Sequence, residues 1–523
     1  MIFQNKTAGK KQVRIIIVLQ LLLPLSLFAQ TFTTQTISNY YKENDLYTND
    51  SVAHTAWKPI LQKGTTNGNT EGTWFNRKFF HEHLLSVIQP NFQLYGDAIF
   101  DECIGKSSRS QKTPNLNTRG YEVSGTIGEH FYFQTAFYEN AARFGGYIDS
   151  FVRQNLVIPG QGGFKNEGDG KGFDYSVSTA RLIYTPNKYV SFDFGYGKNF
   201  IGDGYRSLLL SDWSFNYPYF KVTTTFGRFQ YNVMWSQYIS QRNRIDNNKL
   251  GYYRKWSQTF LLDWKPTDKL AIGLFESVIW PDQDSMRHKD ISPWLASPVM
   301  FLHGSKSPEG VQNFDITGLN ASYKILNSTS IYAQFALDNL GIAGWEKRYA
   351  VQGGIRSANI FVNGLNVLVE GNMARPYTYA SNSLNTNYAH NNQPLAHPLG
   401  ANFKEGLGVV DFTYNDKWFF RLEGFIAQYG ADSSAFVNYG QNIFKPLDTH
   451  TVTENTSIGE GLKTNIHFAD LRVAYIINPV TNMRIEAGFT YRTERGGHGL
   501  IKYTDKIVSV GIKMGFRKIF YDY

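Results

Sequence analysis

Two long polar segments, residues 198–218 and 374–405, hold the side chains best suited to chemistry. Each combines Trp or Tyr with Arg, Asp, Asn or His. Aromatic faces pack against the C–H faces of sugar rings, while the polar groups hydrogen-bond sugar hydroxyls. An alternative stays open from the residues alone, namely that the same side chains bind the loops to each other and fill the protein's interior. The candidate carbohydrate contacts are Arg206, Asp212, Trp213, Tyr217, Arg375, Tyr377, Tyr379 and His390.

Sequence motifs for catalysis and cofactor binding are missing. The chain has no G-x-S-x-G, no H-E-x-x-H and no P-loop. Its one cysteine, Cys103, excludes a Cys-based zinc site and a disulfide within the chain. His390 and His397 could form a metal pair, but hydrogen bonding within a structured loop is the ordinary interpretation. We therefore expect no enzyme activity, no metal and no cofactor.

The start of the chain predicts export. Four basic residues precede an apolar run from Ile15 to Ala29, which is typical of a secretory signal peptide over residues 1–29. The net charge of +9 falls to about +5 without those four residues, which gives no argument for nucleic acid as a partner. With 16% aromatic and 18% charged residues, the chain is too aromatic and too weakly charged to be disordered.

Hydrophobic periodicity changes near residue 90. In the segment 30–90, predicted to be periplasmic, Phe75, Phe79, Leu84, Val87 and Ile88 fall near helical spacing, which predicts one helix ended by Pro90. From residue 91 to 523 the period is two. In the last strand, for example, every second residue from 508 to 516 is apolar and the residues between are Ser, Gly, Lys and Gly.

The alternating segments predict an all-β, antiparallel transmembrane β-barrel of about eighteen strands. The segments run for about 9–11 residues, which suits tilted membrane strands better than the strands of a soluble sandwich. Short links rich in Gly, Pro, Asn and Asp alternate with long ones, as do periplasmic turns and external loops. Closure is required because unpaired backbone groups are costly in hydrocarbon. Basic residues of the interior face, including Arg421, Arg472 and Arg484, are expected to form ion pairs with nearby carboxylates.

The predicted location is the outer membrane, in contact with its lipid. The end of the last strand, Ser509 to Phe516, is similar to the C-terminal signal that the barrel-assembly machinery reads during insertion. Residues 517–523 follow it here, where that signal usually ends the chain.

Several sequence blocks resemble a known family. They are NTRGYEVSG (117–125), VIPGQG (157–162), GYGKNFIGDGYRSLLLSDWSFNYPY (195–219), GLFESVIW (273–280), SPVMF (297–301), YAQFALDNL (332–340) and the region from ARPYTYASNS to HNNQPLAHPLGANFKEG (374–406). These blocks resemble Bacteroidetes outer-membrane proteins of the capsule-assembly family typified by Wzi, including gliding-motility relatives called RemB. The resemblance implies an eighteen-stranded barrel with an N-terminal periplasmic helical part. Trp213 departs from the smaller polar residue expected in relatives.

The resemblance also implies a function. It suggests a lectin-like, non-enzymatic protein that holds capsular polysaccharide or other exopolysaccharide on the cell surface, or that supports gliding. Two alternatives stay open: a porin-like channel for small solutes, and a structural component of a gliding or secretion machine that binds other machine proteins.

Overall fold

The computed structural model describes residues 33–35, 54–62, 72–110, 113–166, 168, 170, 172–244, 252–284, 287–288, 297–302, 313–338, 348–383, 385–449, 457–497 and 502–523. The predicted signal peptide lies outside these residues.

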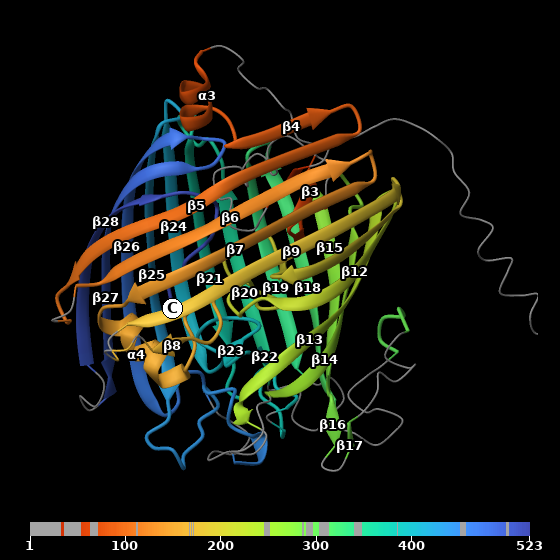
Figure 1. The fold of residues 1–523 in the computed structure, drawn as a ribbon. Helices are drawn as coiled ribbons and strands as arrows, with labels where there is room; N and C mark the ends of the chain where they lie inside the picture. Colours follow the sequence, from red (N-terminus) through yellow and green to blue (C-terminus); the bar gives the residue numbers. More distant parts are fainter. Residues whose placement is uncertain are drawn as a thin grey trace, which may run out of the picture.

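The described chain forms a closed antiparallel barrel of eighteen strands, as predicted (Figure 1). The wall consists of β5 (Phe92–Ser107), β6 (Asn115–Ile127), β7 (Phe131–Arg143), β9 (Phe173–Asn187), β10 (Val190–Gly197), β12 (Tyr217–Phe226), β13 (Phe229–Arg244), β14 (Tyr252–Trp264), β15 (Leu270–Pro281), β18 (Phe314–Leu326), β19 (Thr329–Asp338), β20 (Tyr349–Ser357), β21 (Leu365–Ala374), β24 (Phe403–Tyr414), β25 (Trp418–Ala431), β26 (Leu462–Asn478), β27 (Met483–Gly496) and β28 (Lys502–Lys513). Pairing of β28 with β5, from Ile507↔Ser107 to Lys513↔Asp101, closes the wall.

One end of the barrel carries the short turns and the other carries the long loops (Figure 1). Tight hairpins need residues that accept positive φ, and the turns supply them: Gly128 and Gly227 both lie at φ 58°, and Asn415 and Asp416 lie at 50° and 54°. We call the end with the short turns the periplasmic end and the other the extracellular end, following the usual construction of such barrels.

The wall strands place apolar side chains outward, while their inward face carries polar residues together with apolar ones that pack against the plug. On β25, Leu422 and Ile426 are 51% and 62% exposed, while Glu423 and Phe425 between them are buried in the lumen. A soluble sandwich would bury its apolar face instead, so this wall is built to meet hydrocarbon. The described helices include none that is long and apolar enough to span a membrane.

The predicted helix over 74–89 is shorter than expected. Helix α3 covers only Trp74–Phe80, with the Thr73 side chain capping its first turn. Leu85–Gln89 instead forms β4, because the protruding end of β5 offers backbone partners from Phe92 to Gly96. The helix lies at the periplasmic rim, where the Asn478 amide donates to the backbone carbonyls of Lys78 and Glu82.

The remaining elements are short. Helix α4 (Gly146–Asn155) and strand β8 (Lys165–Asn166) lie in the loop between β7 and β9, and the 3₁₀ helix η4 spans Leu447–Thr449. Four small strand pairs lie apart from the wall: β1 (Thr33–Gln35) with β3 (Ile60–Gln62), β2 (Trp57–Lys58) with β11 (Phe200–Ile201), β16 (Gln283–Asp284) with β17 (Arg287–His288), and β22 (Ala389–His390) with β23 (Gln393–Pro394).

Four segments fill the lumen, and we call them together the plug. They are residues 54–60, 198–216, 375–402 and 514–523. Each segment places at least one buried residue there, namely Trp57, Leu209, Tyr379 and Phe520 in turn. The C-terminal end of the chain lies inside the barrel (Figure 1). Residues 54–60 were predicted to be periplasmic, but β2 pairs with β11 inside the lumen and His54 bonds Asp263 at 2.6 Å.

Candidate functional site

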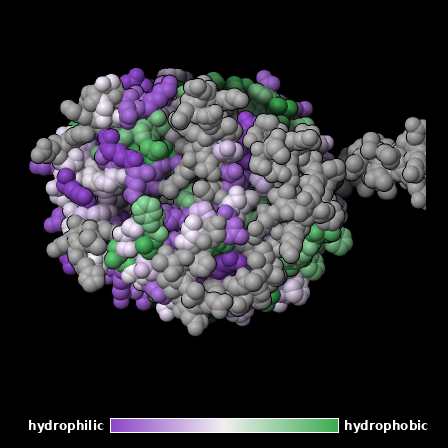
Figure 2. Space-filling model, turned by 90° about the horizontal axis from the view of Figure 1, so that it is seen from below, coloured by the Kyte–Doolittle hydropathy of each residue, from purple (hydrophilic) through white to green (hydrophobic). Residues whose placement is uncertain are grey.

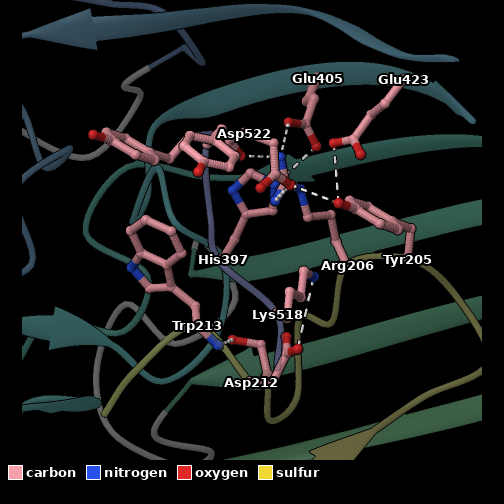
Figure 3. A network of polar contacts seen from close by, with 12 residues as sticks. Tyr205, Arg206, Asp212, Trp213, His397, Glu405, Glu423, Lys518 and Asp522 are labelled. Carbon is pink, nitrogen blue, oxygen red and sulfur yellow. Dashed lines mark hydrogen bonds and ion pairs between the residues drawn. The ribbon is translucent and has the colours of Figure 1, made fainter. Parts of the chain in front are cut away.

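Arg206 is the centre of a buried ionic network that joins three parts of the chain (Figure 3). Its Nη1 donates to Asp522 Oδ2 at 2.8 Å, and its Nη2 donates to the Asp522 carbonyl at 2.6 Å and to Glu405 Oε1 at 3.3 Å. Burial disfavours a charged guanidinium, but Glu405 and Asp522 outweigh it and hold the pKa of Arg206 well above its ordinary value. This network therefore connects the 198–216 loop, the 514–523 tail and β24.

Carboxylates from the inner wall bind the loop on its other side. Glu370 of β21 accepts the backbone N–H groups of Tyr205 and Arg206 at 2.8 and 3.1 Å. The Tyr205 hydroxyl oxygen lies 3.0 Å from Glu423 Oε1 and 2.8 Å from Asp522 Oδ2, so its single proton is within hydrogen-bond distance of both carboxyl groups. Strand alternation points these side chains into the lumen, so the wall itself fixes the loop.

His397 supports the same centre from the 375–402 loop. Its Nε2 lies 2.9 Å from Glu405 Oε2, and its ring stacks on Phe403 with the centroids 4.1 Å apart. Burial lowers the pKa of His397 although Glu405 opposes that shift. A neutral imidazole donating to a carboxylate fits this geometry.

Asp212 and Trp213 are also enclosed in the plug (Figure 3). Trp213 is 1% exposed, and its ring lies 5.3 Å from that of Phe520 and 5.2 Å from that of Tyr523. Asp212 contacts Lys518 at 3.6 Å. In this arrangement both residues hold the tail to the 198–216 loop.

Tyr217, Tyr379 and His390 complete the buried candidates. The Tyr217 ring meets His390 edge-on at 5.7 Å, and the Tyr379 hydroxyl donates to the Leu208 carbonyl at 2.8 Å. The His390 ring bridges two segments: its Nδ1 accepts the Ile239 N–H at 3.0 Å and its Nε2 donates to the Asn216 carbonyl at 3.1 Å. This pairing requires the neutral imidazole.

Acidification should therefore loosen the plug at His390. Burial lowers the pKa of His390 to about 3, against an ordinary value of 6.5. Between these values the unfolded segment binds a proton that the folded one does not, so stability falls as the pH drops through this window. We expect the free energy of opening the plug to fall by roughly 2 kcal/mol between pH 7.5 and pH 5 because of this histidine. Hydrogen exchange of residues 386–397, corrected for intrinsic rates, measures this loss.

A His390→Gln variant provides the control for that experiment. A glutamine amide can both accept and donate, but it does not titrate. Its plug should show a smaller change in exchange between the two pH values than the unmodified protein, and the change that remains is the contribution of His397, whose pKa is also lowered by burial. An equal acid response in the variant would assign the effect to another group.

The remaining two candidates lie at the outer edge of the plug. Arg375 and Tyr377 are half-buried at the extracellular end of β21. The Arg375 guanidinium sits 5.5 Å from the centroid of the Tyr349 ring, and the Tyr377 hydroxyl donates to the Asn438 carbonyl at 2.7 Å. The eight candidates thus form a buried group of six and an accessible pair, and the structure does not bring them together in one open site.

The periplasmic half of the lumen contains a cavity that is partly open to solvent. Ion pairs line it, as predicted for the inner wall: Arg472 with Asp470 at 2.7 Å and Arg484 with Glu486 at 2.9 Å. Arg421 reaches Asp411 at 3.1 Å. Residues of the 514–523 tail form one side of this cavity. The part of the chain that the structure describes holds no group of three or more His, Cys, Asp or Glu side chains placed to bind a metal.

Important partners were not among the sequence candidates. Glu405 contacts the plug from the wall, and Asp522 and Trp57 belong to the plug itself, yet none stood out by type. The clearest available signal was the tail 517–523, whose aromatic and charged residues continue past the last strand.

An eighteen-strand closed barrel with an apolar outer wall defines an outer-membrane β-barrel, and the protein is located in that membrane. No protein-family model and no curated protein sequence matches the chain. Among solved structures, the chain is similar to Wzi of Escherichia coli, an outer-membrane protein involved in group 1 capsule assembly and a carbohydrate-binding barrel. The TM-score is 0.50 and the identity 15%, over 80% of this chain and 85% of Wzi.

Other barrels match less well. OprD of Pseudomonas aeruginosa gives a TM-score of 0.42 at 9% identity, covering 82% of this chain and 95% of OprD. OccAB2 of Acinetobacter baumannii gives 0.44 at 8% identity, covering 81% and 97%. At such identities the likeness concerns the fold alone.

Proposed function

We propose that the protein binds surface polysaccharide at its extracellular end and so takes part in capsule or exopolysaccharide assembly, without enzymatic activity. The filling of the lumen by four of the chain's own segments carries this proposal, because it leaves the outer loops as the place for a large ligand. The likeness to the carbohydrate-binding barrel Wzi supports it. A porin-like channel is the second candidate, and the plug argues against it.

The outer loops form a fixed platform around the accessible pair. Asn402 donates to the carbonyls of Tyr439 and Glu460, each at 3.0 Å, and accepts the Gly459 N–H at 2.7 Å. These bonds fasten the loop after β25 to the loop that carries Arg375 and Tyr377. The described surface at this end is largely hydrophilic, with scattered apolar residues (Figure 2). Such a mixture suits the hydroxyl and C–H faces of sugars.

In this proposal Arg375 and Tyr377 contact sugar, while Arg206, Asp212, Trp213, Tyr217, Tyr379 and His390 hold the loops in place. A polymer presents the same unit many times, so weak contacts on neighbouring molecules add through avidity. No cofactor or metal is needed. A signal peptide over 1–29, a segment over 30–90 that is partly periplasmic, insertion by the barrel-assembly machinery and contacts with gliding proteins belong to the same proposal.

Replacing the accessible pair should weaken binding of purified protein to the exopolysaccharide of its own organism. Arg375→Ala and Tyr377→Ala together remove one charged and one aromatic contact, and we expect a loss of about ten- to a hundredfold in apparent affinity. Binding to the immobilised polymer, with the protein in nanodiscs, measures this effect.

An Arg228→Ala variant is the matched control. Arg228 pairs with Asp268 at 3.1 Å on a periplasmic turn, with both side chains more than half exposed. This change should leave polymer binding intact. Equal binding by the control and the double variant would refute the assignment of Arg375 and Tyr377. If neither the intact protein nor the control binds the polymer, the proposed function is refuted.

A further inference from the structure

Part of the outward wall is covered by the chain itself. Gln258 and Phe260 of β14 and Val278 of β15 are 0% exposed. Outward residues elsewhere at mid-strand, such as Leu422 at 51%, are open. The covered patch therefore differs from the ordinary lipid-facing surface of this barrel.

Strand alternation shows that these residues face outward. On β14, Lys255 bonds the Asn387 carbonyl of the plug at 2.6 Å, and Asp263 bonds His54. Odd-numbered residues of β14 thus point into the lumen, and even-numbered ones point to the outside. On β15, Phe275 and Ile279 belong to the lumenal core, which turns Glu276 outward together with Val278.

Residues 297–302, which belong to the long loop between β15 and β18, lie on this patch. The Gln258 amide donates to the Ser297 carbonyl at 2.7 Å, and the Tyr231 hydroxyl donates to the Pro298 carbonyl at 2.6 Å. The backbone N–H of Phe301 donates to Glu276 Oε2 at 2.5 Å. Three outward wall side chains, from three neighbouring strands, hold the segment.

The segment reaches halfway down the wall. Gln258 is the middle residue of β14, and Glu276 lies near the middle of β15, directly opposite Phe260. The loop leaves the wall at the extracellular end, after Pro281. Residues 297–302 therefore lie along the outside of the barrel, at the level where other strands expose apolar residues.

The contacts fit a hydrocarbon environment. A carboxylate and an amide on the lipid face of a barrel are costly without partners, and the backbone of this segment supplies those partners. On its far side the segment exposes apolar groups instead: Val299 at 54%, Phe301 at 48% and Leu302 at 40%. Phe301 adopts φ 61°, an uncommon conformation for a bulky residue, with its N–H turned to Glu276 and its side chain half exposed.

We infer that residues 297–302 are embedded in the outer leaflet of the membrane, with Val299, Phe301 and Leu302 in contact with lipid acyl chains. Glu276 and Gln258 anchor the segment to the wall. Residues 297–302 thus supply an extra lipid-binding surface on the β13–β15 side of the barrel.

Depth-dependent fluorescence quenching tests this inference. A fluorophore is attached at Val299→Cys in a Cys103→Ser background, and the full-length protein is placed in vesicles. Spin-labelled acyl chains should quench its fluorescence strongly. The extent of quenching should be within about twofold of that for a label at Leu422→Cys, which lies on the open wall. Aqueous iodide should quench it several times less than a label at Phe436→Cys, which is 97% exposed in an outer loop.

Strong quenching by iodide and weak quenching by lipid would overturn the inference. Weak quenching by both would overturn it as well, because it would mean that another protein surface covers the segment. Neither result depends on polysaccharide binding.

Variants of Glu276 test the anchor in the same assay. Glu276→Leu removes the acceptor of the Phe301 N–H, so the label at position 299 should shift toward iodide quenching. Glu276→Gln keeps an acceptor oxygen and should preserve the lipid pattern. If Glu276→Leu leaves the lipid and iodide quenching unchanged, and its gel mobility shows a folded barrel, then Glu276 does not anchor the segment.

Discussion

A barrel without residues 198–216 and 514–523 should conduct ions, whereas the intact protein should not. These two segments fill much of the lumen; Leu208, Leu209 and Leu210 in the first are fully buried. A porin wall of this strand number surrounds an aqueous channel when nothing fills it. We expect conductance in planar bilayers to rise at least about tenfold. The hairpin can be closed with Asn-Gly, because Gly197 and Tyr217 are already paired neighbours.

The control is a deletion of residues 433–436, which are exposed in an outer loop and take no part in the plug. That variant should not conduct ions. Both deletion variants must first show the heat-sensitive gel mobility that indicates a folded barrel. A folded deletion variant that remains silent, or an intact protein that conducts equally well, would contradict a lumen closed by these segments.

The wall could be predicted from the sequence because lipid constrains every second residue. On β28, Val508, Val510 and Ile512 are exposed outward as the pattern indicated. The strand ends were underestimated for the same reason. Segments of about 9–11 residues were predicted, but β26 runs for 17 residues, from Leu462 to Asn478, since hydrogen bonding of the sheet continues where outward residues need no longer be apolar.

The segment 74–89 shows where periodicity alone is insufficient. Leu84, Val87 and Ile88 fit helical spacing, but the pairing of β4 with β5 decides their structure. The partner residues 92–96 follow directly across the turn at Pro90 and Asn91, so β4 and β5 form a local hairpin that helical spacing of the apolar residues does not reveal.

The plug shows the same limit for the candidate site. Residue type singled out Arg206 and Trp213 as sugar contacts, and the structure shows that both make specific contacts within the protein, because type does not distinguish a sugar ligand from a protein partner. The partner of Arg206 is 316 residues away, in the tail. Only the closed topology, which returns the chain into its own lumen, brings these groups together.

Arg206→Ala should release the tail while the barrel stays inserted. The change leaves Glu405 and Asp522 buried without their guanidinium, and breaking such a pair costs about 3–5 kcal/mol. The population in which residues 514–523 are open should therefore rise by about two to four orders of magnitude. Hydrogen exchange of the tail measures that population.

A double variant separates the loss of a charge from the loss of packing. In Arg206→Met with Glu405→Gln, the long side chain is kept and one of the two buried carboxylates becomes neutral. This variant should recover much of the protection that Arg206→Met alone loses, because the penalty comes mainly from unpaired charge. Equal exchange in the single and double variants would mean that Arg206 acts through its packing on Phe425 and Tyr205 instead. In that case the ionic network would be a consequence of the tail's position and not its cause.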